Sequence, residues 1–287
     1  MSRAYIEKLF KDFVPEIDES LMKKEIEKAK TDAALHANKE TYRRIYNFID
    51  LTSLNVTDNR TSIREFCERV NRFYESHPAL DNVAGVCVYP NFIETVSETL
   101  KDDRVKKVVV SGVFPSAQSF FSVKIAEIEL SAQKGADEID VVINVGELID
   151  GNYELVLKEL QLMKQAAGNA HLKVILETGA YPQLRMIKMA AILSMAAEAD
   201  FIKTSTGKIN VSATPEAAYI MLTAIKEFYE ATGKKVGFKP AGGISTPDDA
   251  LLYYTLVKNI LGEEWLTPEL FRIGASRLAG KLESLIL

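Results

Sequence analysis

The chain has 287 residues, of which 47% are hydrophobic and 26% are charged, a composition typical of soluble globular proteins. Its net charge of -5 argues against a general nucleic-acid binder, because such proteins carry an excess of Lys and Arg. The N-terminus has no continuous apolar leader and no apolar run is long enough to cross a bilayer, so we expect a cytoplasmic protein without membrane contact.

The first 45 residues are predicted to form helices. Apolar residues recur at helical spacing on both sides of a break that begins at Pro15 and includes the polar residues 18–20. The repeating part of the chain starts only after them. We therefore expect residues 1–45 to be a helical extension that packs on the repeating domain formed by residues 46–287.

From residue 46 onward, short apolar runs alternate with amphipathic stretches of helical period. The runs, which we predict to be strands, cover residues 48–51, 83–88, 108–110, 139–143, 172–176, 201–203, 236–239 and 271–273. The predicted helices include residues 63–74, 121–133, 153–166, 183–196, 216–229 and 247–256. About eight strand–helix units over about 240 residues indicate an α/β fold of the (β/α)8 TIM barrel type. The alternative is an open doubly wound sheet, which is disfavoured because no GxGxxG turn follows the first strand.

Two lysines, Lys203 and Lys239, each end one of the predicted strands. A lysine at the end of a buried strand is costly unless it is paired or used. Strand alternation directs both lysines and Asp140 into the barrel, at the strand ends where barrel active sites lie. Burial and a neighbouring ammonium both disfavour the charged amine, and an uncharged lysine attacks carbonyl groups. Asp140 would balance the remaining charge and relay protons.

The alternative for these three side chains is a buried ion pair that only holds the barrel together. The same alternation directs Asp50 and Thr52 inward on the first strand, and Lys173 and Glu177 inward on the fifth. We expect Lys173 to lie near the bottom of the barrel and to form a structural ion pair there.

Loops rich in small residues follow the sixth, seventh and eighth strands, at the corner where this fold binds phosphate. They lie at positions 206–208, 242–243 and 274–276. Glycine lets backbone N–H groups approach an anion, so these loops favour a phosphate site, the alternative being ordinary tight turns.

The cysteines and histidines do not form a recognisable metal or disulfide pattern. Cys67 and Cys87 belong to no CxxC pair, and we predict buried free thiols in a reducing compartment. The three histidines lie outside any HExxH frame, so we expect no metal site.

Six segments in the correct order resemble the deoxyribose-phosphate aldolase family. Residues 201–208 resemble its Schiff-base motif, residues 236–243 its second lysine motif and residues 136–142 its aspartate motif. Segments 49–54, 86–90 and 172–179 also fit the family. The two lysine motifs together are highly specific.

The resemblance implies a class I aldolase that needs no metal or other cofactor. Such enzymes reversibly cleave 2-deoxy-D-ribose 5-phosphate to D-glyceraldehyde 3-phosphate and acetaldehyde, in deoxyribonucleotide catabolism. By motif position, Lys203 is the Schiff-base lysine, Lys239 is the charged neighbour that keeps Lys203 uncharged, and Asp140 is the proton-relay acid/base. The positions expected to bind substrate and phosphate are Asp50, Thr52, Cys87, Gly207, Lys208, Gly242, Gly243, Gly274 and Ser276.

Some observations and alternatives stand beside this resemblance. Arg277 follows Ser276, where a second serine is common in the family, and residues 112–115 depart from the usual Asn-Phe-Pro. Barrels of this type often pair, so we expect a homodimer. The rival functions are another Schiff-base aldolase or transaldolase with a different sugar phosphate, and a catalytically silent barrel that senses one.

Overall fold

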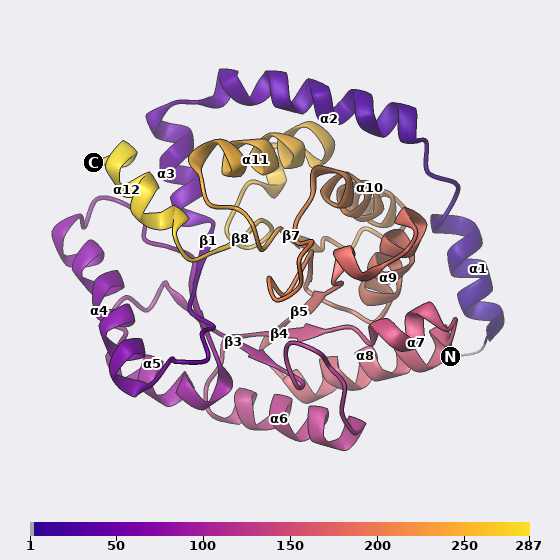
Figure 1. Cartoon of the computed structure of the whole chain (residues 1–287), viewed down its shortest axis with the longest axis horizontal. Coiled ribbons are helices and arrows are strands. Elements are labelled where there is room, and N and C mark those ends of the chain that lie inside the picture. Colours follow the sequence, from indigo (N-terminus) through magenta and orange to yellow (C-terminus); the bar gives the residue numbers. More distant parts are fainter. Residues whose placement is uncertain (1–2) are drawn as a thin grey trace.

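The computed structural model describes residues 3–287, and its centre is a barrel of eight parallel strands (Figure 1). The strands are β1 (Ile49–Thr52), β2 (Gly85–Val88), β3 (Lys106–Ser111), β4 (Glu138–Val142), β5 (His171–Ile175), β6 (Phe201–Lys203), β7 (Gly237–Lys239) and β8 (Ile273–Ala275). Hydrogen bonds join them in the order β7-β6-β5-β4-β3-β2-β1-β8. Bridges from Phe238 to Phe271 and from Ala241 to Gly274 connect the two ends, so the predicted (β/α)8 barrel is confirmed.

Helices surround the barrel on its outside (Figure 1). They are α4 (Arg60–Ser76), α5 (Ile93–Thr99), α6 (Phe121–Gln133), α7 (Val145–Ile149), α8 (Tyr153–Ala167), α9 (Leu184–Ala196), α10 (Pro215–Thr232), α11 (Pro247–Leu261) and α12 (Leu278–Ile286). The 3-10 turns are η1 (Ala34–His36), η2 (Pro90–Phe92), η3 (Thr178–Ala180) and η4 (Glu263–Trp265). The six helices named from the sequence are present, whereas the ranges of α5, α7 and α12 were not among those named. With seven, five and nine residues they are too short to show a clear helical period.

Three helices precede β1, namely α1 (Arg3–Phe13), α2 (Glu19–Ala33) and α3 (Lys39–Asn47). The predicted break lies between α1 and α2, where the Asp18 side chain accepts a hydrogen bond from the Leu21 amide and so caps α2. Helix α2 contacts α10 and α11, and α1 contacts α8, α9 and α10 (Figure 1). The buried face of α2 carries Met22, Ile26 and Ala29. The extension therefore packs apolar side chains against the outer helices.

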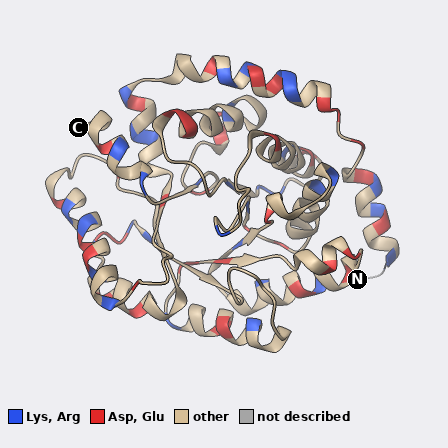
Figure 2. Ribbon diagram, viewed as in Figure 1, with Lys and Arg blue, Asp and Glu red and all other residues tan. Residues whose placement is uncertain are grey.

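The outer faces of the helices carry interspersed Lys, Arg, Asp and Glu, most clearly along α1, α2 and α4 (Figure 2). Within residues 3–287, no helix is long and apolar enough to span a membrane.

The barrel interior has two different halves. Beside β2 and β3 it is apolar, because Cys87, Val108 and Val110 form a small cluster with Leu54 above them. Their strand neighbours, such as Val86 and Val109, point the other way and join the main core under the helices. The half formed by β4 to β8 and β1 instead carries charged side chains, and this half contains the candidate active site.

Candidate active site

Asp140 joins the two lysines that end neighbouring strands. Lys203 Nζ donates to Asp140 Oδ2 at 2.8 Å, and Lys239 Nζ donates to the same oxygen at 2.7 Å. The lysines are paired residues in the β6–β7 register, and Asp140 reaches them from β4 across the barrel. All three side chains are buried. The inward orientation predicted for them is confirmed.

Electrostatics makes the three groups unequal. Burial acts to raise the pKa of Asp140, but the ammonium groups of Lys203 and Lys239 outweigh it and hold that pKa well below its ordinary range. Burial acts to lower the pKa of Lys239, but the carboxylates of Asp140 and Asp50 outweigh it and raise that pKa. At neutral pH, Asp140 is therefore ionised and Lys239 is charged.

The ion pairs continue below Asp140 toward the other end of the barrel. Asp50 Oδ2 lies 2.5 Å from Lys239 Nζ. The other oxygen, Asp50 Oδ1, accepts a hydrogen bond from Arg272 Nη1 at 2.5 Å. Arg272 Nη2 also donates to Glu138 Oε1 at 2.8 Å. Lys173 contacts Glu138 and lies 3.4 Å from Asp140 Oδ1. The structural ion pair predicted for Lys173 is present, and it extends the lysine site into a larger buried network.

Lys203 also faces a pocket of about 290 Å³ at the C-terminal end of the barrel. Three cations line this pocket, Lys203, Lys208 and Arg277, and no Asp or Glu is among its described lining residues. Such a wall favours an anionic ligand. The predicted phosphate residues that line it are Thr52, Gly207, Lys208, Gly242, Gly243, Gly274 and Ser276.

Two predicted residues do not reach the pocket. Asp50 and Cys87 were expected to bind substrate together with Thr52, but both are fully buried and neither lines the pocket. Asp50 is held by Lys239 and Arg272, and Cys87 packs in the apolar half of the barrel. Burial raises the pKa of the Cys87 thiol to about 11, so it is uncharged at neutral pH.

Glycine is required at one point of the pocket wall. Gly242 has φ of +84°, and a Cβ atom there would lie 2.6 Å from the Cβ of Ser212. A larger residue would therefore clash with the loop after β6 and strain the backbone.

The loop after β6 is fixed by a carboxylate from the neighbouring strand end. Glu177 accepts from the Thr206 amide at 3.1 Å and from Thr206 Oγ1 at 2.6 Å. The Lys208 amide then donates to Thr206 Oγ1 at 3.0 Å, and Lys208 Nζ contacts the carbonyl of Leu54 across the pocket. Glu177 has a positive φ of 54°, a strained conformation of the kind found at functional sites.

Two members of the charged network were not singled out from the sequence. Glu138 begins β4, and Arg272 directly precedes β8. The signal for both was a charged residue inside or beside an apolar run, which is costly to bury without a partner.

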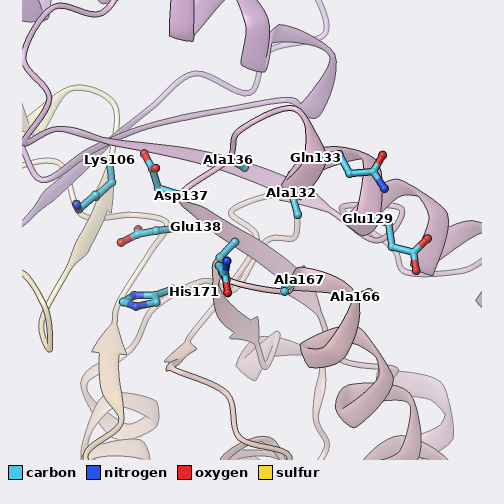
Figure 3. A pocket seen from close by; sticks show the side chains of 13 residues that line it. Lys106, Glu129, Ala132, Gln133, Ala136, Asp137, Glu138, Ala166, Ala167 and His171 are labelled. Atoms are coloured by element: carbon cyan, nitrogen blue, oxygen red, sulfur yellow. The ribbon is translucent and has the colours of Figure 1, made fainter.

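A larger hollow of about 760 Å³ lies at the opposite ends of β3, β4 and β5 (Figure 3). Lys106, Glu138 and His171, from the starts of these strands, lie on one side of it. Neither Lys203 nor Lys239 lines this hollow. The smaller pocket is therefore the candidate active site, because it holds an amine beside an anion-binding wall.

Comparisons with known proteins point to one family. The family model described as DeoC/LacD family aldolase matches residues 45–264. A putative deoxyribose-phosphate aldolase of Caenorhabditis elegans is 46% identical over 255 residues, which cover 88% of this chain and 84% of that protein. The deoxyribose-phosphate aldolase of Homo sapiens is 42% identical over 246 residues, covering 82% and 77%. The crystal structure of a putative deoxyribose-phosphate aldolase from Coccidioides immitis is 27% identical, has a TM-score of 0.72, and covers 86% of this chain and 87% of that chain.

Proposed function

This chain belongs to the DeoC/LacD family of aldolases, and we propose that it cleaves 2-deoxy-D-ribose 5-phosphate through a Schiff base on Lys203. One observation carries the assignment of the nucleophile. Among the lysines of residues 3–287, Lys203 alone both lines the pocket and pairs with Asp140. Its amine can therefore meet a substrate and exchange protons with a buried carboxylate.

The reaction begins when the uncharged amine of Lys203 adds to the C1 aldehyde of the open-chain sugar. Loss of water from the carbinolamine gives a protonated imine, which is an electron sink at C1. The ionised Asp140 removes the proton of the C3 hydroxyl through a water molecule, beside the charged amine of Lys239. The contacts of Asp140 with Lys203 and Lys239 support this role.

The C2–C3 bond then breaks, and its electron pair forms the enamine between C1 and C2. C3 becomes the aldehyde carbon of D-glyceraldehyde 3-phosphate, which leaves. The enamine takes a proton at C2, and water hydrolyses the resulting imine to acetaldehyde and the free Lys203 amine. The acetaldehyde methyl group would face Leu54, the member of the apolar cluster that lines the pocket.

The phosphate group is bound by the pocket wall far from the reacting carbons. Lys208 and Arg277 supply positive charge, and the loops that contain Gly242 and Gly274 allow close backbone approach. Binding energy from this remote group orients C1 toward Lys203. We place the reaction in the breakdown of deoxyribonucleotides, which is the route that yields this sugar phosphate.

Trapping tests this function directly. The protein is incubated with acetaldehyde, reduced with borohydride and digested, and the modified peptide is identified by mass spectrometry. We expect one adduct on Lys203 and none in Lys203→Met. Lys188→Met is the matched control, because Lys188 is a buried lysine that pairs with Glu227 away from the pocket. An unmodified Lys203 in the wild type would refute the aldolase mechanism.

Substrate comparison separates the rival aldolases. We expect cleavage of 2-deoxyribose 5-phosphate to exceed that of fructose and gluconate phosphates. The reverse preference would indicate a different Schiff-base aldolase, and binding without cleavage would indicate a silent sensor.

The positions of the pocket residues in the sequence suggest how the chain divides into a catalytic part and an extension. We propose that residues 46–287 are the catalytic barrel and that residues 1–45 are a helical extension packed on it. All lining residues of the pocket fall between Thr52 and Arg277, which supports this division.

For assembly and location we propose a homodimer in the cytoplasm. Three exposed apolar side chains lie on one face of α6 and its N-cap, those of Phe120, Val123 and Leu130. An exposed apolar face of this kind supports pairing with a second copy of the chain. The buried free thiols of Cys67 and Cys87 support a reducing compartment. Light scattering should give the mass of two chains, and the double variant Phe120→Ser, Leu130→Ser should give one. A wild-type mass of one chain would contradict the dimer.

A further inference from the structure

The buried side chains around and below Lys203 carry one more positive than negative charge when all are ionised. The cations are Lys173, Lys203, Lys239 and Arg272, and the carboxylates are Asp50, Glu138 and Asp140. Ion pairs link all seven, and each is at most 4% exposed. An uncompensated buried charge is costly, so one of the amines is expected to give up its proton.

The contacts identify which amine that is. The ammonium of Lys173 faces three carboxylates, those of Glu138, Asp140 and Asp50, with the last at 4.0 Å. Lys239 faces two, at 2.5 and 2.7 Å. Among the carboxylates of residues 3–287, Lys203 pairs with Asp140 alone, through the same oxygen that also accepts from Lys239. Lys203 therefore has the least electrostatic support for its charge.

We propose that Lys173 and Glu138, on the side of Asp140 away from the pocket, set the pH at which Lys203 becomes a nucleophile. Both are positioning residues, since neither lines the pocket. Lys173 contacts Asp140 directly, and Glu138 reaches Asp140 through Lys173. Glu138 in fact borders the hollow at the opposite end of the barrel (Figure 3). The proposal rests on the proposed function of Lys203 and extends its control beyond Lys239.

The physical reason is charge balance in a medium that screens poorly. Removal of the Lys173 cation leaves three cations and three carboxylates, so Lys203 can keep its proton to higher pH. Removal of the Glu138 charge leaves four cations and two carboxylates, so Lys203 loses its proton at lower pH. The effect of one buried charge on a neighbour is about one pH unit or more.

The titratable groups near Lys203 other than the seven of this network have no described ion pair with Lys173 or Glu138, so replacing either residue leaves their partners unchanged. The Cys87 thiol is uncharged at neutral pH. Glu177 is hydrogen-bonded to Thr206 and has no described ion pair with any of the seven. Lys208 and Arg277 face the pocket and are joined to none of the seven by a described ion pair. Differences between variants therefore report on the network itself.

The test measures the pH at which acetaldehyde and borohydride label half of Lys203 in a fixed time. Mass spectrometry follows the labelled peptide in the wild type, Lys173→Met, Glu138→Gln and the double variant. We expect the half-labelling pH to rise by about one unit in Lys173→Met and to fall by about one unit in Glu138→Gln. The double variant, which removes one charge of each sign, should return close to the wild type.

Circular dichroism establishes that each variant is folded. If Lys173→Met does not fold, Arg272→Gln removes a cation from the same network and should give the same upward shift. The proposal is overturned if both single variants label like the wild type, if both shift in one direction, or if wild-type Lys203 labels only near pH 10.4, where a free lysine titrates. Absence of any label on wild-type Lys203 would instead refute the proposed function.

Discussion

Lys203 and Lys239 donate hydrogen bonds to one carboxylate oxygen, Oδ2 of Asp140, at 2.8 and 2.7 Å. The two amines differ in what else surrounds them. Lys239 has a second carboxylate, Asp50, at 2.5 Å and lies away from the pocket, whereas Lys203 lines the pocket. The pair is therefore asymmetric, with Lys239 as the retained cation and Lys203 as the amine that reacts.

Replacement of Lys239 by Leu should reduce activity near pH 7 by about 100-fold or more, as expected for loss of an activating group. Without the neighbouring cation, Lys203 can stay protonated and balance Asp140, so it no longer attacks an aldehyde. Activity should recover in part as the pH rises and Lys203 loses its proton. The measurement is the pH dependence of kcat/KM.

The matched control is Lys235→Leu, because Lys235 lies four residues earlier and pairs with Glu264 at the surface. Its pH profile should equal that of the wild type. If Lys239→Leu also kept the wild-type profile, Lys239 would have no effect on the charge of Lys203.

The phosphate wall gives a second prediction. Lys208→Met should raise KM for 2-deoxyribose 5-phosphate by about 10- to 100-fold, because a charge-assisted hydrogen bond to phosphate contributes about 1.5–3 kcal/mol. KM for unphosphorylated 2-deoxyribose should hardly change. Lys234→Met is the control, since Lys234 pairs with Glu198 at the surface. Equal losses with both sugars would show that Lys208 does not bind the phosphate.

Sequence patterns predicted the barrel well because each signal was local. Strand ends were marked by apolar runs that stop at a charged residue, such as Lys203 and Lys239, and helix starts by Thr-Pro pairs at Thr214 and Thr246. Both threonines cap their helices as side-chain acceptors. Alternation along the strands then directed Asp140 to the lysines.

The partners inside the barrel could not be predicted in the same way. Arg272 meets Asp50 on the neighbouring strand and Glu138 across the barrel, at sequence separations of 222 and 134 residues. Alternation gives the direction of a side chain but neither its height in the barrel nor its reach. For this reason Asp50 was expected to bind substrate, whereas it is buried and does not line the pocket.

A capping carboxylate after the Gly242 loop provides a prediction on stability. Asp249 accepts from the amides of Ser245 and Thr246 at 3.1 and 2.9 Å, and Ser245 lines the pocket. Burial acts to raise the pKa of Asp249, but the hydrogen bond from Thr246 and the backbone amides outweigh it and lower that pKa. Asp249→Ala should reduce the free energy of unfolding by about 1 kcal/mol at pH 7.

The sign of the pH dependence follows from the lowered pKa. Ionised Asp249 contributes its stability above the unfolded value of 3.8, and this contribution is lost as the pH falls through the lower folded value. Urea unfolding of the wild type and Asp249→Ala should therefore differ less at pH 3 than at pH 7. Asp248→Ala, at the exposed neighbouring position, should change stability little. A difference that does not depend on pH would refute an ionic role for Asp249.

The N-terminal extension should stabilise the barrel through the buried face of α2. Met22 is 1% exposed and packs in the main core, whereas the adjacent Leu21 is 46% exposed. Met22→Ala should lower the free energy of unfolding by about 2–4 kcal/mol, since it leaves a cavity, and Leu21→Ala by less than about 0.5 kcal/mol. Urea unfolding measures both variants, and kcat at low temperature should stay unchanged because neither residue approaches the pocket. Equal small effects would mean that α2 contributes nothing to the stability of the barrel, because the buried position would then behave like the exposed one.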